Sequence, residues 1–386
     1  MIHSERLAET FTELVGIDSV SKEEAGVSSA ICRMLAPWEP EILVDGAAQS
    51  TGSDTGNLII RIAGNTNAAP LMLNAHMDTV EPGRGVVPQL HDGVFTSRGD
   101  TVLGADDKSA IAIILEALRV VKENDLPHGP VELVFTICEE IGLLGAKNLE
   151  YSLISAPFGY ALDTSETESI IVRAPAANHF DIGMYGKDAH AGADPERGIN
   201  AIFLACQAVA GLQLGRIDEE TTCNIGVFEA PGATNIVPRY ARIKGEARSH
   251  DEAKLGEVTK TITGAFEDAV SGYCHAAGTQ GLPRADINVS NEFPATHIPE
   301  DHPVVVLAGK AAQALGREIT PRRSGGGSDA NIFFANGIVT GVLGTGMTDI
   351  HSTRESIRLA EMVKSAELLV QILCHHAQGT GSKAAG

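Results

Sequence analysis

Short apolar runs alternate with segments of helical periodicity along the first part of the chain, and this order restricts the fold more than any other feature. The apolar runs cover Asn57–Ile62, Leu71–Ala75, Val131–Ile137 and Gly159–Leu162, and the helical segments cover Glu5–Val15, Glu24–Leu35 and Lys108–Lys122. Apolar runs of this length are typical of strands buried on both faces of a sheet. Strands and helices that alternate in this way predict an α/β layer with a mainly parallel sheet.

The pattern changes near Pro175. From Tyr240 to Ala247, polar and small or apolar residues alternate, which is typical of a half-exposed antiparallel strand. Strands are expected at Asn178–Tyr185, Cys223–Glu229, Arg239–Ala247 and Ala285–Val289, with helices at Ile199–Leu212 and Glu252–Tyr273. The order β-α-β-β-α-β resembles the small ferredoxin-like unit.

After Phe293 the α/β pattern returns. Helices are expected at Val304–Leu315, Ser328–Ala335 and Ile357–His376, and a strand at Gly337–Leu343. We therefore predict two domains, one inserted into the other. Residues 1–175 and 293–386 would form the α/β domain, and residues 176–292 the inserted α+β domain.

The net charge restricts the partners. The 386 residues include 29 Lys and Arg against 50 Asp and Glu, which gives a formal charge of −21. Binding to nucleic acid or to an anionic membrane surface depends on clustered basic residues, so we expect neither as a partner. The negative charge is explained by solubility alone, or in part by acids that bind metal cations.

The cysteines and the apolar segments bear on the compartment. The six cysteines include no CxxC spacing, and no apolar stretch approaches the roughly 20 residues that span a bilayer. The first residues lack a basic segment followed by an apolar run, so we expect no signal peptide. A cytoplasmic location is the simplest expectation.

Histidines and carboxylates follow the predicted strands at the points where these end. The candidates are His76 with Asp78, Asp106, the pair Glu139 and Glu140, Asp163, and His351. Taken singly, each has an ordinary structural explanation, such as a helix N-cap for Asp106 or a surface turn for Glu139. Because the carboxyl ends of parallel strands meet at one edge of a sheet, these side chains are expected to converge there. Two imidazoles and three carboxylates suit a pair of divalent cations, and Glu139 is then left free to act as a general base.

Seven segments together resemble a known family. They read NAHMDTV, GADDKS, ICEEIGLLGAK, DAHAGADPERGINAI, TNIVPRYARIKGEARSHD, SGGGSDANIF and DIHS. In this order they are similar to motifs of the M20 metallopeptidases, above all of the peptidase T-like branch, and the match extends from about residue 57 to residue 375. The resemblance implies a zinc-binding α/β catalytic domain that is interrupted by a lid domain.

The resemblance also implies metal-binding and catalytic roles. His76 and Asp163 would bind one zinc, Glu140 and His351 the other, and Asp106 would bridge the two. Asp78 would orient His76. Glu139 would act first as general base and then as general acid. Members of the family often have a cis peptide after the bridging aspartate, here between Asp106 and Asp107.

The inserted domain would supply groups that bind the substrate. His190 resembles the family histidine that helps to hold the scissile carbonyl oxygen. Asn235 and Arg248 resemble groups that grip a substrate carboxylate, and the turn with Gly326 and Gly327 would offer backbone N–H groups to it. Structural alternatives remain for all of these residues: an ion pair at a strand edge for Arg248, turns for Asn235 and the glycines, and a loop position for His190.

The activity implied is metal-assisted hydrolysis of amide bonds in short peptides, with a tripeptide aminopeptidase as the specific expectation. A carboxypeptidase or an N-acyl amino acid deacylase shares the same ligands and is the alternative within the family. Two alternatives belong to other functional classes. A nucleotide-binding protein built on Ser324–Ser328 is disfavoured because that run lacks the GxxxxGK[ST] pattern. A non-catalytic metal-dependent binding protein is disfavoured because Glu139 accompanies all five ligands.

The sequence restricts the identity of the metal and the oligomeric state less than it restricts the fold. Three carboxylates and two imidazoles accept Zn²⁺, Co²⁺ or Mn²⁺, with zinc as the expectation from the resemblance. Members of the family often dimerise through the lid, so we expect a homodimer that forms through the inserted domain.

Overall fold

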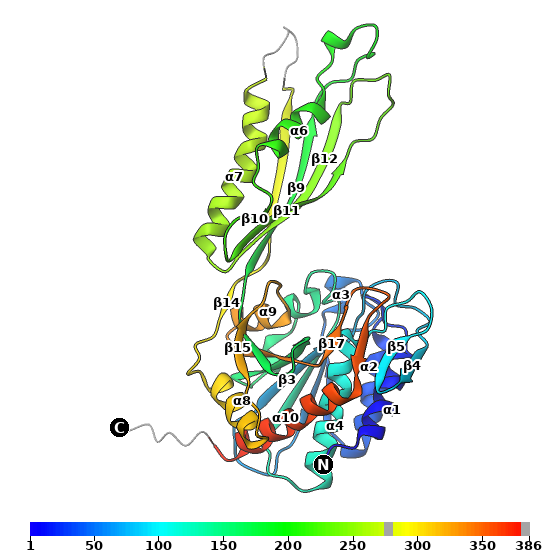
Figure 1. Ribbon diagram of the computed structural model, residues 1–386, viewed down its shortest axis with the longest axis vertical. Coiled ribbons are helices and arrows are strands. Elements are labelled where there is room, and N and C mark those ends of the chain that lie inside the picture. Colours follow the sequence, from blue (N-terminus) through cyan, green and yellow to red (C-terminus); the bar gives the residue numbers. More distant parts are fainter. Residues whose placement is uncertain (274–280, 380–386) are drawn as a thin grey trace, which may run out of the picture. The chain divides into compact units, whose positions relative to one another are not determined.

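The computed structural model describes residues 1–273 and 281–379 (Figure 1). The chain divides into two compact units. Unit 1 comprises Met1–Arg173, His297–Ser324 and Ser328–Gly386, and unit 2 comprises Ala174–Thr296 and Gly325–Gly327. The three glycines of the second segment were not expected to group with the inserted domain. That unit 2 acts as a lid stays a prediction.

A nine-stranded sheet forms the centre of the described part of unit 1. Its strands follow the order β1-β2-β6-β3-β7-β16-β8-β14, and β15 pairs with β8. They span Glu41–Val44 (β1), Leu58–Ile62 (β2), Leu71–His76 (β3), Val131–Thr136 (β6), Phe158–Thr164 (β7), Ser169–Ala174 (β8), Thr296–His297 (β14), Thr320–Arg323 (β15) and Val339–Gly344 (β16). The four central strands, β6, β3, β7 and β16, run parallel to one another.

The edge of this sheet that carries β1 and β2 is antiparallel. β2 pairs antiparallel with β6, and β1 pairs antiparallel with β2. Residues 63–70, which connect β2 to β3, contain no helix. A parallel crossover needs a longer connection, so β2 runs against the central strands. The predicted parallel sheet is thus confirmed for its centre, whereas the run at β2 belongs to an antiparallel edge.

The longer helices of unit 1 agree with the periodic segments to within a few residues, whereas two four-residue helices, at Ala48–Thr51 and Leu144–Lys147, were not predicted. They span Ser4–Val15 (α1), Ala25–Leu35 (α2), Ala48–Thr51 (α3), Ala105–Glu123 (α4), Leu144–Lys147 (α5), Pro303–Ala314 (α8), Asp329–Ala335 (α9) and Leu359–Ala377 (α10). A small second sheet combines Pro88–His91 (β4), Val94–Ser97 (β5), Met347–Thr348 (β17) and Ser356–Arg358 (β18). None of the helices between residues 1 and 273 or between 281 and 379 is long and apolar enough to cross a membrane.

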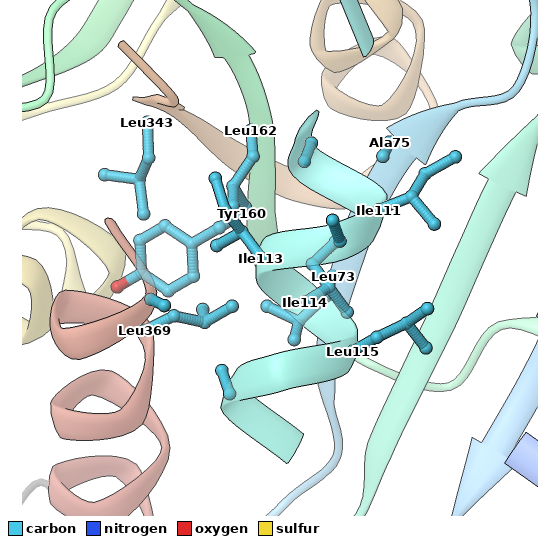
Figure 2. Packing of buried hydrophobic residues seen from close by; sticks show 14 of the residues in the cluster. Leu73, Ala75, Ile111, Ile113, Ile114, Leu115, Tyr160, Leu162, Leu343 and Leu369 are labelled. Carbon is cyan, nitrogen blue, oxygen red and sulfur yellow. The ribbon is translucent and has the colours of Figure 1, made fainter. Parts of the chain in front are cut away.

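Helix α4 is buried along nearly its whole length and packs against β3 and β7. Figure 2 shows Ile111 and Ile114 of this helix among Leu73, Tyr160 and other side chains of the core. A helix that is apolar on nearly all sides is typical of the interior of a large domain. Asp106 and Asp107, at the start of α4, have non-helical backbone angles, so these carboxylates lie directly before the regular, buried part of the helix, whose packing fixes where they lie.

The two faces of β7 contact different layers. Tyr160 and Leu162 belong to the main core with α4 and α8, whereas Ala161 packs with Ala330 of α9 and with Val342. Since successive side chains of a strand point to opposite faces, α4 and α9 cover opposite faces of β7. The sheet therefore lies between helical layers, as expected for the α/β class.

Unit 2 is an α+β unit with a core of its own. It contains Ala176–Tyr185 (β9), Ala201–Ala210 (α6), Gly215–Arg216 (β10), Thr221–Glu229 (β11), Tyr240–Ser249 (β12), Glu252–Ser271 (α7) and Arg284–Phe293 (β13). Its strands pair antiparallel in the order β10-β11-β12-β9-β13. Apart from the short β10, the elements follow the predicted order β-α-β-β-α-β. Ile182, Leu204 and Phe266 are among the side chains buried between the sheet and its helices.

Candidate active site

Five of the predicted site residues meet at the carboxyl edge of the parallel strands of unit 1. His76 is the last residue of β3, and Asp163 lies one residue before the end of β7. Asp106 opens α4, Glu140 follows β6, and His351 follows β17. The convergence comes from the parallel arrangement of β3, β6 and β7, which brings their carboxyl ends to one edge.

Asp106 lies between the two histidines. Its Oδ1 is 3.1 Å from Nε2 of His76, and its Oδ2 is 3.2 Å from Nε2 of His351. Burial alone would raise the pKa of Asp106, but the hydrogen bonds from His351 and His76 outweigh it and hold the pKa well below its usual range. One carboxylate thus presents a different oxygen to each imidazole, which is the arrangement a bridging ligand needs.

Glu140 and His351 form the more open side of the cluster. Oε1 of Glu140 lies 3.0 Å from Nε2 of His351. Hydrogen bonds to Asp106 and Glu140 raise the pKa of His351 to about 10. The side chain of His351 is 49% exposed, whereas that of His76 is 2% exposed. Solvent therefore reaches the cluster on the side of His351.

Asp163 lies on the buried side, together with a carboxylate that was not predicted as a ligand. Ligand atoms of His76, Asp107 and Asp163 lie within 4.8 Å of one another, as do those of His76, Asp106 and Glu140. The Asp106–Asp107 peptide is cis. Oδ2 of Asp107 accepts the backbone N–H of His76 at 3.2 Å, while its buried Oδ1 finds no hydrogen-bond partner among the described residues.

Burial raises the pKa of both Asp163 and Asp107 well above the usual range for a carboxyl group. Further negative charge from Asp106 adds to the shift at each. Buried carboxylates in such proximity are costly unless cations compensate them. The donor set and the unpartnered Oδ1 of Asp107 thus fit a site for divalent metal ions.

Asp78 contacts His76 and also the turn that follows β6. Nδ1 of His76 hydrogen-bonds the main-chain oxygen of Asp78 at 2.9 Å and lies 3.4 Å from its Oδ1. The carboxylate itself accepts the backbone N–H groups of Glu139 at 2.9 Å and Glu140 at 3.2 Å, and the hydroxyl of Ser21 at 2.6 Å. Asp78 therefore orients the imidazole mainly through its backbone and holds the turn after β6 through its side chain.

Glu139 is half-buried and lies close enough to His76 and Asp163 for their charges to act on it. Burial raises the pKa of its carboxyl group well above the usual range, and the negative charge of Asp163 adds to this, while the charge of His76 opposes it. A carboxyl group with a raised pKa is suited to take up a proton and return it near neutral pH. The direction of this pKa shift is the one that a general base of the site needs.

Two further buried carboxylates belong to the same neighbourhood. Glu355 accepts the backbone N–H groups of Leu103 at 2.7 Å, Gly104 at 2.8 Å and Asp106 at 2.9 Å. Asp329, the first residue of α9, accepts the hydroxyl of Thr136, and burial raises its pKa to about 6. Neither was predicted from the sequence, although Asp329 lies in the segment SGGGSDANIF and Glu355 follows His351 by four residues.

His190 and Asn235, two of the predicted substrate-binding residues, lie close together in unit 2. The residue after His190 donates its N–H to the main-chain oxygen of Asn235 at 2.9 Å. Nδ1 of His190 accepts the N–H groups of Gly192 at 3.2 Å and Ala193 at 3.1 Å. A neutral imidazole then carries its proton on Nε2, which leaves an N–H donor on the exposed side of this residue.

Arg248 forms a second group with the glycine turn. Its Nε and Nη2 each donate to Glu246 at 3.0 Å, and its Nη1 donates to the main-chain oxygen of Gly325 at 3.3 Å. The guanidinium group lies 5.8 Å from the ring centre of Phe293, and a Cβ on Gly327 would meet the same ring at 2.5 Å. The turn through Gly326 therefore packs beside Arg248, and any larger residue at position 327 would have to displace the Phe293 ring.

The two groups lie at opposite ends of the sheet of unit 2. In the register of β12 against β9, Tyr240 pairs with Tyr185 and Arg248 pairs with Ala177. His190 and Asn235 lie beyond the Tyr185 end, whereas Arg248 lies at the other end. Eight residues along a strand correspond to about 26 Å.

Comparison with known proteins identifies the family. The model of peptidase family M20/M25/M40 matches residues 72–375. The chain belongs to this family. The uncharacterized protein YqjE of Bacillus subtilis (strain 168) is 41% identical to this M20 peptidase over 374 residues, which cover 97% of this chain and 99% of that protein.

Two solved structures are similar to this M20 peptidase over almost its whole length. Aminopeptidase PepT from Bacillus cereus ATCC 10987 gives a TM-score of 0.88 at 39% identity, covering 97% of this chain and 99% of that one. A tripeptidase (SAV1512) from Staphylococcus aureus subsp. aureus mu50 gives a TM-score of 0.92 at 36% identity, covering 98% and 100%. These findings confirm the predicted family, its peptidase T-like branch, the α/β fold and a metal-dependent hydrolase of peptide bonds.

Proposed function

We propose that this M20 peptidase is a two-metal aminopeptidase of short peptides, with tripeptides as its preferred substrates. The observation that carries the proposal is the position of Asp106, whose two carboxylate oxygens each face a different histidine. The similarity to an aminopeptidase PepT and to a tripeptidase supports the choice of substrate.

In this proposal His76 and Asp163 hold one divalent ion, Glu140 and His351 hold the other, and Asp106 bridges them. Zinc is the expected metal, and Co²⁺ and Mn²⁺ suit the same donors. Bound ions of this kind would lower the pKa of water at the site and polarise the scissile carbonyl group. Asp107 is a further candidate ligand beside His76 and Asp163.

The side chains have separate tasks in this scheme. Glu139 takes a proton from the attacking water and returns it to the leaving amine, which its raised pKa favours. Asp78 keeps the imidazole of His76 and the turn of Glu139 in place. His190 donates Nε2–H to the developing oxyanion, because its Nδ1 already accepts two backbone N–H groups.

Arg248 would bind the free carboxylate of the substrate. Its guanidinium group is shared with Glu246 and Gly325, so the substrate would compete with a surface ion pair whose partners are about one-third exposed. Ion pairs of this kind are worth little, and their replacement by a peptide carboxylate is therefore inexpensive. The same contact would serve a carboxypeptidase or an N-acyl amino acid deacylase, which remain the alternatives within the family.

A substrate panel distinguishes these activities. The panel contains a tripeptide, its N-acetyl derivative, its C-terminal amide and an N-acetyl amino acid, and mass spectrometry identifies the products. We expect release of the first residue from the free tripeptide. We expect amidation of the C-terminus to lower kcat/KM by about 10–100-fold, as for loss of a charge-assisted hydrogen bond.

Arg248→Ala and Arg242→Ala are the matched variants for this panel. Both arginines lie on β12, and Arg242 pairs with Asp181. Arg248→Ala should cleave the tripeptide and its amide with equal efficiency, and Arg242→Ala should keep the preference of the wild type. Release of the last residue from the N-acetyl tripeptide would instead identify a carboxypeptidase. Absence of hydrolysis with both metals bound would favour the non-catalytic binding protein.

The homodimer through unit 2 is part of the proposal. An extended tripeptide is about 10 Å long, whereas the His190 group and the Arg248 group lie about 26 Å apart along one sheet. One substrate therefore cannot contact both groups of the same unit. A second copy of the chain that contributes His190 and Asn235 would remove this conflict, in keeping with the two-fold symmetry of most homodimers.

Mixing two inactive variants tests this arrangement. His190→Ala and Arg248→Ala should each lower kcat/KM by about 10²-fold on their own. If the two residues of one site come from different copies, a reassociated equimolar mixture should recover about a quarter of the wild-type activity, because half of the dimers contain one intact site. Two different affinity tags verify that mixed dimers have formed. A monomer in sedimentation, or mixed dimers without recovery, would contradict the proposal.

A further inference from the structure

A buried carboxylate of the N-terminal region contacts the turn that carries the general base. Glu24 lies at the start of α2 and is fully buried, yet its side chain does not cap that helix. Its Oε1 accepts the backbone N–H and the thiol of Cys138 at 2.9 Å and 3.3 Å, and the backbone N–H of Lys22 at 2.9 Å. Its Oε2 accepts the hydroxyl of Ser53 at 2.5 Å.

Cys138 begins the turn in which Glu139 and Glu140 follow. Its φ angle is +52°, in the left-handed region that residues other than glycine rarely adopt. The next two backbone N–H groups, those of Glu139 and Glu140, donate to Asp78. Three successive amides of the turn are thus bound by two carboxylates, and Glu24 supplies the contact at the strained residue.

The segment that contains Glu24 is itself attached to the loop after β3. The hydroxyl of Ser19 donates to the main-chain oxygen of Met77 at 2.8 Å, and the N–H of Thr79 donates to the main-chain oxygen of Ser19 at 3.0 Å. Ser21 donates to Asp78 at 2.6 Å. The short stretch from Ser19 to Glu24 therefore connects the loop of His76 to the turn of Glu139. It lies outside the residues matched by the family model.

We propose that Glu24 is a positioning residue for catalysis, which fixes the direction of the Glu139 carboxylate by holding Cys138 in its left-handed conformation. The inference rests on the proposed role of Glu139 as general base. Glu24 does not touch the reacting atoms, and it acts through the backbone of the turn. A misplacement of about 1 Å at a catalytic group costs about 10²-fold in rate, so the contact has a measurable consequence.

Three substitutions separate hydrogen-bond geometry from charge. In Glu24→Gln, the side-chain oxygen retains the donors of Cys138 and Lys22, and the amide NH₂ donates to a rotated Ser53 hydroxyl. Glu24→Asp keeps the charge but is one methylene shorter, so it cannot reach both Cys138 and Ser53. Glu24→Ala removes every acceptor. We therefore expect the neutral Gln variant to be more active than the charged Asp variant.

The expected results are specific. Glu24→Asp and Glu24→Ala should lower kcat by about 10–100-fold with little change in KM, and Glu24→Gln should stay close to the wild type. If Glu24→Ala does not fold, the comparison of kcat between Glu24→Asp and Glu24→Gln tests the proposal. Glu132 provides the matched control, because it is a buried carboxylate that accepts the N–H groups of Ser155 and Ala156 at the start of β6. Glu132→Asp should lower Tm without lowering kcat.

Amide hydrogen exchange gives a readout that does not depend on turnover. Exchange in the peptide that contains Cys138–Glu140 should rise in Glu24→Asp and Glu24→Ala, but not in Glu24→Gln or Glu132→Asp. If the wild type hydrolyses no peptide, the proposed function fails while this exchange pattern still tests the positioning role. Unchanged exchange in Glu24→Asp, or equal losses of kcat in the Gln and Asp variants, would overturn the inference.

Discussion

Replacing Glu139 by Gln is expected to lower kcat by about 10²–10⁴-fold, the range for removal of a general base. Glu139 is half-buried, and desolvation raises the pKa of its carboxyl group, which suits it to proton transfer. The amide of Gln has nearly the same shape but cannot accept the proton of water. KM should change little, because the groups proposed to bind the substrate are untouched.

Metal binding should survive this substitution. Glu139 belongs to neither group of potential ligands, which are formed by His76 with Asp106 and Glu140, and by His76 with Asp107 and Asp163. The number of metal ions per chain, measured by elemental analysis after dialysis, should equal that of the wild type. Glu166→Gln, at an exposed position, is the surface control. Normal turnover in Glu139→Gln, or loss of metal together with activity, would sink the assignment.

The sequence was sufficient to predict the neighbourhood of the site because the relevant signals are local. A histidine or carboxylate directly after a buried strand must lie near the edge of the sheet, and His76, Asp163 and Glu140 do so. The parallel order of β3, β6 and β7 then brings these positions together. The resemblance added the pairing of His351 with Asp106, which are separated by more than 240 residues.

The supporting carboxylates could not be predicted in the same way. Glu24 precedes the turn of Cys138 by 114 residues, and Glu355 follows the amide of Leu103 by 252 residues. Such contacts depend on how loops fold back on one another, and no periodicity in the sequence indicates them. A buried glutamate near a helix start is indistinguishable by sequence from an exposed helix cap. The unpartnered oxygen of Asp107 likewise becomes visible only in three dimensions.

Short strands with polar residues were also missed. β4 is exposed over most of its length and β5 buries only Phe95 of its four residues, and the two pair in a small separate sheet, so they lack the apolar runs on which strand prediction depends. The strand register within unit 2 could not be predicted either, for a different reason. The order of its elements was predicted, but the strand register, which separates His190 from Arg248, follows only from the pairing of β9 with β12.

Removal of the metal ions is expected to abolish turnover and to reverse the way in which stability depends on pH. In the metal-free protein, burial raises the pKa of Asp163, Asp107 and Glu139. In the unfolded chain such groups ionise near pH 4, so above that pH the folded state holds more protons than the unfolded state. Stability must then fall as the pH rises, because the unfolded state binds fewer protons.

The other ionisable groups of the site do not oppose this trend between pH 5 and 8. The pKa of His351 is raised to about 10, so the stability it contributes is complete below about pH 6.5 and is lost as the pH rises through 10. The pKa of Asp106 is lowered, so its contribution is lost only at acidic pH, below the usual range for a carboxyl group. Metal binding needs deprotonated ligands and therefore strengthens as the pH rises. Loaded and chelated protein should thus respond to pH in opposite directions.

Thermal unfolding of the chelated and the metal-loaded protein at pH 5.5 and pH 8 measures this difference. A loss of 1 kcal/mol corresponds to a decrease in Tm of about 2–4 °C for domains of 150–250 residues. The Tm of the chelated protein should be lower at pH 8 than at pH 5.5. The difference in Tm between the loaded and the chelated protein should therefore be larger at pH 8 than at pH 5.5. Restored activity after addition of Zn²⁺, Co²⁺ or Mn²⁺ excludes irreversible damage by the chelator.

Asp163→Asn separates the contribution of one buried carboxylate from that of the whole cluster. The asparagine cannot ionise, so the chelated variant should lose less stability between pH 5.5 and pH 8 than the chelated wild type does. The variant should also bind metal more weakly, because a proposed ligand is missing. The difference in Tm between its loaded and chelated forms should therefore be smaller than for the wild type. A chelated wild type with constant or rising Tm over this range would show that the buried carboxylates are compensated without metal. Equal pH slopes for the two chelated proteins would instead show that Asp163 does not drive the effect, which would transfer it to Asp107 and Glu139.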